Sequence, residues 1–274
     1  MLLRRLSVPL TALALVAGSW MTVASASAAT AHGSTAALAH SNTSGFVPGG
    51  RMLTSPGAAR PDTTGAVNQE VESSNWSGYA ATGSDGAFTS VSSSWTEPTA
   101  TCTSRTDEYA AFWVGLDGYN SDSVEQTGTD SDCDGRTPDY YGWYEMYPAD
   151  PVYYSNTVEP GDHFSASVTF SGSETYTLTL TDSTQGWTQK VTENESGLDR
   201  SSAEVITEAP SSETGVLPLA DFGTVNYSGA EANGTALGSL SPTEIIMVDS
   251  RGRDEDSTSA ISGGSFSNTW IRSN

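Results

Sequence analysis

Hydrophobic and polar residues alternate with a period of two in several short stretches of the chain, and turn-forming clusters separate these stretches. The clearest alternations span 164–170, 176–180, 245–248 and 266–271, with turns at 159–162, 171–173 and 262–264. A period of two places successive side chains on opposite faces of a β-strand. No amphipathic helix stands out, so the pattern predicts an all-β domain in which antiparallel strands form a β-sandwich.

Two stretches depart from simple alternation because both of their faces carry bulky side chains. Residues 109–118 should form a central strand that is covered on both sides, with one face bearing Trp113, Gly115 and Asp117. Residues 140–148 present a row of aromatic and acidic side chains on one face: Tyr141, Trp143, Glu145 and Tyr147. Such a row is unusual for a pure core, so we expect the two stretches to line one groove.

An amide and a carboxylate occupy comparable positions on two further strands. Alternation places Gln126, Gly128 and Asp130 on one face of the first strand, and Glu204, Ile206 and Glu208 on one face of the second. Together they supply the groups that a catalytic cleft needs. An acid-acting hydrolase is therefore the leading hypothesis.

The chain divides into three parts. Residues 1–29 have the layout of a secretory signal peptide, with Arg4 and Arg5 before a short apolar stretch and small residues at the end. Residues 30–70 lack periodicity and predict a disordered linker or a short propeptide. A masking pro-segment would usually offer a basic face, and only Arg51 and Arg60 are available. Residues 71–274 are long enough for one large domain, which we expect to be exported, extracellular and monomeric.

The composition is strongly acidic, with a formal net charge of −22 and a single lysine, Lys190. Nucleic acids and anionic membranes are therefore poor partners. Solubility of an exported protein explains the charge adequately. The same charge also suits acidic conditions, because surface carboxylates near their ordinary pKa of about 4 become protonated and repel one another less.

The two cysteines of an exported chain predict one disulfide, Cys102 to Cys133, which would fasten loops beside the groove. His163 is the only histidine after residue 70. A cysteine accompanied by this one histidine provides too few ligands for a zinc site. We expect no metal and no cofactor. A serine triad with His163 as the base lacks a Gly-x-Ser-x-Gly elbow, and no Asp-Thr-Gly pair of the pepsin kind is present.

Two alternatives to peptide hydrolysis stay open on these residues. Glu145 and Glu208 beside an aromatic groove could serve glycoside hydrolysis as acid and nucleophile or base. A carbohydrate-binding module without catalysis could stack Trp113, Trp143 and Tyr147 on sugar rings. A peptidase requires Gln126 and Glu208 to face one cleft, whereas a sugar-binding module requires only the aromatic row.

Five separated motifs resemble the glutamic peptidase (eqolisin) family in order and approximate spacing, and together they are far more specific than any one alone. They are Ser74-Asn75-Trp76-Ser77-Gly78, Trp113 to Gly118, Gln126-Thr127-Gly128, Trp143 to Pro148, and Ala203 to Glu208. The resemblance implies a sandwich of two large, bent antiparallel sheets and a peptidase acting at acid pH on polypeptide substrates. It gives the catalytic roles to Gln126 and Glu208, not to Glu204.

The remaining site candidates follow from position beside this pair. We expect them to support the dyad or to bind substrate, and they are Trp76, Trp113, Asp117, Asp130, Trp143, Glu145 and Tyr147. The chain departs from the family pattern at Val205, where an aromatic residue is frequent, and at Ala209-Pro210, where an acidic pair is frequent. Tyr141 stands where some members have an aspartate. The disulfide pattern also differs from that of the fungal members, which favours a bacterial-type branch.

Overall fold

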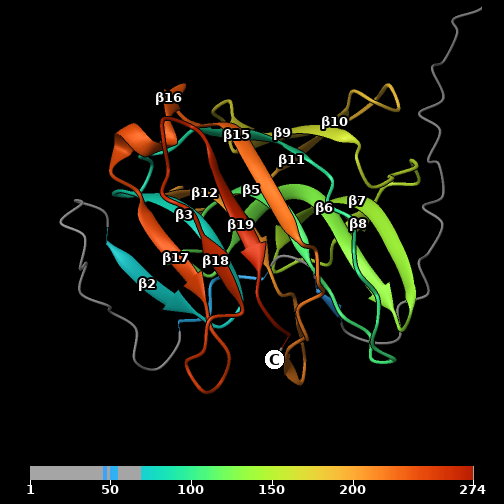
Figure 1. Ribbon diagram of the computed structural model, residues 1–274. Helices are drawn as coiled ribbons and strands as arrows, with labels where there is room; N and C mark the ends of the chain where they lie inside the picture. The colour runs from blue at the N-terminus through green and yellow to red at the C-terminus, as the bar shows by residue number, and fades with distance from the viewer. Residues whose placement is uncertain (1–45, 48–49, 55–68, 274) are drawn as a thin grey trace, which may run out of the picture. The chain divides into compact units, whose positions relative to one another are not determined.

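The computed structural model describes residues 46–47, 50–54 and 69–273 (Figure 1). The predicted signal peptide, 1–29, and most of the predicted linker lie outside these residues. Within the described part, nearly all regular structure is strand, and the helical content is one 3-10 turn at Leu237–Leu240. No helix of the described residues has the length and apolar character needed to cross a membrane.

Two large sheets form the sandwich, as predicted, and all neighbouring strands are antiparallel except the β2–β17 pair. The first, called the site sheet, runs in the order β2 (Glu70–Ser73), β17 (Thr243–Met247), β3 (Trp76–Thr82), β12 (Ser202–Glu208), β5 (Ala111–Leu116), β6 (Val124–Asp134), β7 (Thr137–Tyr147) and β8 (Val152–Tyr153). In Figure 1 it lies beneath the sheet that carries β9, β10 and β15.

The second sheet runs in the order β11 (Trp187–Asn194), β10 (Thr175–Asp182), β9 (His163–Phe170), β4 (Ser90–Thr96), β15 (Thr224–Ala232), β19 (Phe266–Trp270) and β18 (Asp256–Thr258), with β16 (Thr235–Ala236) paired to β15. A small third sheet joins β1 (Phe46–Val47), β13 (Ser211–Ser212) and β14 (Gly215–Val216). It brings residues 46–47 beside the chain that directly follows Glu208.

The main core fills the space between the two large sheets. Phe112 and Val114 of β5 meet the layer that contains Leu178 and Leu180 of β10, and all four are fully buried. Each such side chain contributes roughly 1.5–3 kcal/mol by leaving water. The opposite face of β5 is covered as well, because Trp113 lies in a second apolar cluster. The prediction of a central strand covered on both sides is confirmed.

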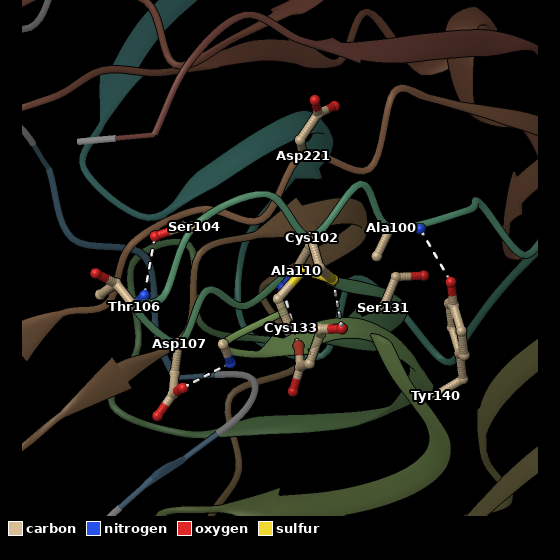
Figure 2. The surroundings of a disulfide bond; sticks show 12 residues. Ala100, Cys102, Ser104, Thr106, Asp107, Ala110, Ser131, Cys133, Tyr140 and Asp221 are labelled. Carbon is tan, nitrogen blue, oxygen red and sulfur yellow. Dashed lines mark hydrogen bonds between the residues drawn. A yellow bond between two sulfur atoms is a disulfide. The ribbon is translucent and has the colours of Figure 1, made fainter. Parts of the chain in front are cut away.

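The predicted disulfide between Cys102 and Cys133 is present, with a Cα–Cα separation of 5.5 Å (Figure 2). Its expected position beside the groove is wrong. Cys133 lies within β6, not in a loop. It follows Gln126 by an odd number of positions, so the two side chains point to opposite faces of the sheet and that of Cys133 enters the core. The bridge lies beside Ala110 and Ser131 and ties the chain after β4 to the core side of β6.

Candidate active site

The candidate site occupies the face of the site sheet that points away from the main core. Glu208 pairs with Trp76 of β3 and with Ala111 of β5, whereas Gln126 pairs with Gly115 of β5. Paired residues share a face, so both side chains project to the same side. They are two strands apart and offset along the strands, because Gly115 in turn pairs with Glu204. The two residues are therefore offset diagonally on one face of the site sheet.

Glu208 is fully buried and accepts two hydrogen bonds from neutral donors. The indole Nε1 of Trp113 donates to Oε2 over 2.9 Å, and Asn75 Nδ2 donates to Oε1 over 3.2 Å. Burial raises the pKa of Glu208 well above its ordinary value, while the donors from Trp113, Trp76 and Asn75 oppose that rise. The edge-to-face contact of Trp76 with Trp113, with ring centroids 4.9 Å apart, holds the indole in place.

Glu145 connects Gln126 to the surroundings of Glu208. Gln126 Nε2 donates to Glu145 Oε2 over 2.8 Å, and both side chains are fully buried. Burial raises the pKa of Glu145 well above its ordinary value, and the charge of Glu208 raises it further. The amide of Gln126 is thus oriented by Glu145, whose pKa depends on the charge of Glu208.

Asp130 lies on the same face, in a separate acidic cluster. It accepts from the Trp143 indole, and the hydroxyl of Tyr141 lies 3.1 Å from Asp130 Oδ2 and 2.5 Å from Asp132 Oδ2. One hydroxyl hydrogen serves only one of these two carboxyl groups. Burial and the neighbouring Asp132 raise the pKa of Asp130 well above its ordinary value. The cluster holds Trp143 by its indole N–H.

Two other predicted residues, Asp117 and Tyr147, have different surroundings. Asp117 has a positive φ of 70° just after β5 and accepts from the backbone amides of Arg200, at 2.6 Å, and Ser201, at 2.8 Å. It therefore fixes the loop that leads into β12. Tyr147, the last residue of β7, is half-buried and packs against the second apolar cluster.

The two tryptophans of the expected aromatic row offer no surface on which a sugar ring could stack. Trp113 and Trp143 have no exposed area, and each uses its indole N–H on a buried carboxyl group. Sugar recognition by stacking requires an exposed ring face. This arrangement disfavours the carbohydrate-binding interpretation.

Two glycines lie against Trp113, Gly128 against its main chain and Cβ and Gly115 against its ring. A Cβ atom at Gly128 would lie 2.6 Å from Trp113 Cβ and 2.2 Å from the Phe112 carbonyl oxygen. A Cβ atom at Gly115 would lie 2.8 Å from Trp113 Cζ3 and 3.3 Å from Gln126 Cβ. Because such contacts are too short, a side chain at either position would force Trp113, whose indole donates to Glu208, or its main chain to shift.

Comparison with known proteins identifies the family. The model of the Peptidase A4 family matches residues 74–270. The chain belongs to this family. It is a glutamic-type peptidase, as the five motifs predicted, and it is 30% identical to Aspergillopepsin-2 of Aspergillus niger over 234 residues, which cover 76% of this chain and 80% of the relative.

Solved structures of A4 peptidases share the fold. Scytalido-glutamic peptidase with a transition state analog inhibitor gives a TM-score of 0.63 at 28% identity, covering 72% of this chain and 98% of that chain. SCP-B, an Eqolisin family member in complex with the tripeptide Ala-Ile-His, gives 0.59 at 28% identity over 72% and 98%. Aspergilloglutamic peptidase from Aspergillus niger gives 0.54 at 27% identity over 60% and 99%.

Sequence analysis missed two parts of this A4 peptidase site. Asn75 precedes Trp76 in a motif that carried the resemblance, but only the structure shows that its amide reaches Glu208. The segment Gly50–Thr54 lies against the same groups, with the Gly50 carbonyl accepting from the Trp76 indole over 3.0 Å. Its composition carried no periodic signal, so no pattern indicated this contact.

Proposed function

We propose that this A4 peptidase is a secreted endopeptidase that hydrolyses peptide bonds at acid pH with Gln126 and Glu208 as its catalytic dyad. One observation carries the proposal: Glu208 is held by two neutral N–H donors on the same sheet face as Gln126. Neither a tryptophan indole nor an asparagine amide loses or gains a proton in acid. The environment of the carboxyl group therefore keeps its donors at the pH where surface carboxylates are neutral.

In the proposed mechanism, Glu208 first acts as the general base. It takes a proton from a water molecule as the water oxygen forms a bond to the carbonyl carbon of the substrate. The carbonyl π electrons move to the oxygen, which becomes an oxyanion. An amide N–H of Gln126 donates to that oxyanion, and stabilising the developing charge is usually the largest single contribution to catalysis.

Glu208 then acts as the general acid. It gives its proton to the peptide nitrogen as the C–N bond breaks, which regenerates the carboxylate and releases an amine and an acid. For stabilising the oxyanion, the glutamine Gln126 is better suited than a second carboxyl group, because an amide donates an N–H without having to share a proton. Glu145 orients the amide by accepting its other hydrogen.

The test is digestion of denatured casein or a quenched peptide library at several pH values from about 3 to 7, with pepstatin and EDTA present. Wild type is compared with Glu208→Gln and with the matched variant Glu204→Gln. Glu204 is also fully buried, and it lies on the same strand and face as Glu208.

We expect acid-side cleavage that resists both inhibitors, is lost by at least 100-fold in folded Glu208→Gln, and persists in Glu204→Gln. Loss in Glu204→Gln with retention in Glu208→Gln would exchange the roles of the two residues. Inhibition by EDTA, or no cleavage by folded wild type at any pH, would overturn the mechanism.

A further inference from the structure

A short extended segment, Gly50–Thr54, lies on the candidate site and contacts its catalytic surroundings through main-chain groups. The Arg51 carbonyl accepts from Asn75 Nδ2 over 3.1 Å, and the Leu53 amide donates to Asn75 Oδ1 over 2.8 Å. The same Asn75 Nδ2 donates to Glu208. One side chain thus joins the segment to the carboxyl group that carries the proposed chemistry.

The segment is secured at both ends. Upstream, β1 pairs with β13, which follows Glu208 by three residues. Downstream, Thr54 forms an antiparallel bridge with Ser73, and the Leu53 carbonyl accepts from the Ser74 amide over 2.9 Å. Binding an extended chain by its backbone groups is the general way in which a protein holds a peptide of variable sequence.

Two neighbouring side chains of the segment have opposite surroundings, solvent for Arg51 and the site for Met52. Arg51 is exposed and pairs with Asp122, while Met52 is only 8% exposed. Met52 belongs to the apolar cluster that contains Trp76, Trp113 and Ile206, and its amide donates to the Gly118 carbonyl over 3.2 Å. A long, unbranched, flexible side chain fills this irregular space beside two indole rings.

We propose that Gly50–Thr54 occupies the peptide-binding groove as an internal substrate mimic, and that Met52 marks a subsite for a long apolar side chain. This inference rests on the proposed function of the same site. Glu208 and Trp113 have no exposed surface while the segment is in place. Polypeptide substrates with methionine or leucine in the register of Met52 should bind after the segment leaves, whereas the residue in the register of Arg51 should matter little.

The experiment measures binding of a fluorescein-labelled peptide, Gly-Arg-Met-Leu-Thr, to the full chain by fluorescence anisotropy. Met52→Asp weakens the resident segment by placing a charge in the apolar cluster. Arg51→Ala is the matched control, because an exposed ion pair contributes little. The second probe is the same peptide with aspartate at its third position.

We expect the methionine peptide to bind Met52→Asp and not wild type or Arg51→Ala. The aspartate peptide should bind Met52→Asp about 10- to 100-fold more weakly, the factor that corresponds to full burial of a methionine side chain. Equal binding of the methionine peptide to wild type and Met52→Asp, or equal binding of both peptides, would overturn the inference. Neither readout depends on cleavage, so failure of casein digestion alone would refute only the proposed mechanism.

A second measurement needs no variant. Hydrogen exchange of wild type should show protection of the Met52 and Leu53 amides, which donate to the Gly118 carbonyl and to Asn75. Rapid exchange of both amides in the folded full chain would contradict a seated segment, whether or not Met52→Asp folds.

Discussion

Gln126 donates an amide hydrogen to Glu145 over 2.8 Å, so the orientation of the proposed oxyanion donor is set by a carboxyl group on the neighbouring strand. The two residues are directly paired in the ladder between β6 and β7. Their bond fixes the orientation of the Gln126 side-chain amide. Glu145 is therefore a positioning residue in the proposed mechanism.

Replacing Gln126 with alanine should lower kcat by roughly 100- to 1000-fold, because one oxyanion donor is lost. The KM should change much less, since the bond is proposed to form in the transition state. Steady-state kinetics at acid pH measure both quantities. Gln189→Ala, which removes a glutamine from β11 on the second sheet, is the control and should keep wild-type kinetics.

Replacing Trp113 with phenylalanine should move the acid limb of the pH–kcat/KM profile to higher pH. The indole N–H stabilises ionised Glu208, so its loss raises the pKa of the base further. A shift of about one pH unit corresponds to about 1.4 kcal/mol of lost interaction. Trp95→Phe is the control, because its indole donates to the Thr129 hydroxyl in the core. An unchanged limb in folded Trp113→Phe would argue against Glu208 as the base.

Alternation was sufficient to place Gln126 and Asp130 on one face of their strand, and Glu204 and Glu208 on one face of theirs, because the two-residue period is a local property. The disulfide partners followed from having only two cysteines. The side of the sheet on which the bridge lies required the exact limits of β6, since Cys133 falls inside the strand. Strand ends are where local patterns carry least information.

Asp117 shows a different limit of sequence reasoning. Its parity with Trp113 predicted a place near the dyad, but a positive φ turns the chain just after β5 and directs the carboxyl group to the Arg200 and Ser201 amides. Asn75 and Gly50–Thr54 were missed for another reason. Their contacts join residues far apart in the sequence, and no local period encodes such a contact.

Folding stability should fall as the pH rises from about 4.5 towards 9. Burial raises the pKa of Glu97 to about 8 and that of Glu125 to about 9. Between the unfolded and folded pKa values the native state binds more protons than the unfolded state, so stability decreases with increasing pH. The stabilising effect is complete below the unfolded pKa and is lost as the pH passes through the folded one.

Thermal unfolding at pH 5 and pH 8 measures this dependence. Glu125→Gln should show a smaller fall in Tm between the two pH values than wild type, because glutamine cannot ionise. The exposed Glu195→Gln is the control and should behave as wild type. A Tm that rises from pH 5 to pH 8 would contradict the prediction.

Removing the disulfide should reduce stability without changing catalysis. Cys102→Ala with Cys133→Ala opens a link across a sequence separation of 31 residues, for which a loss of about 2–4 kcal/mol is typical. The bridge lies on the core side of β6, opposite to Gln126. Urea unfolding should therefore show a lower midpoint, while kcat of the folded double variant stays at the wild-type level.

The glycines beneath Trp113 make the site sensitive to residues that never contact a reacting atom. An alanine at 128 adds one methyl group, yet that group would collide with the Phe112 carbonyl oxygen and with the start of the Trp113 side chain. A shift of Trp113 would disturb the hydrogen bond that its indole donates to Glu208. In a saturation mutagenesis survey scored by proteolysis, Gly128 should be as intolerant as Glu208. Selection on this site therefore acts on backbone positions that have no side chain, and a survey of the reacting groups alone would overlook them.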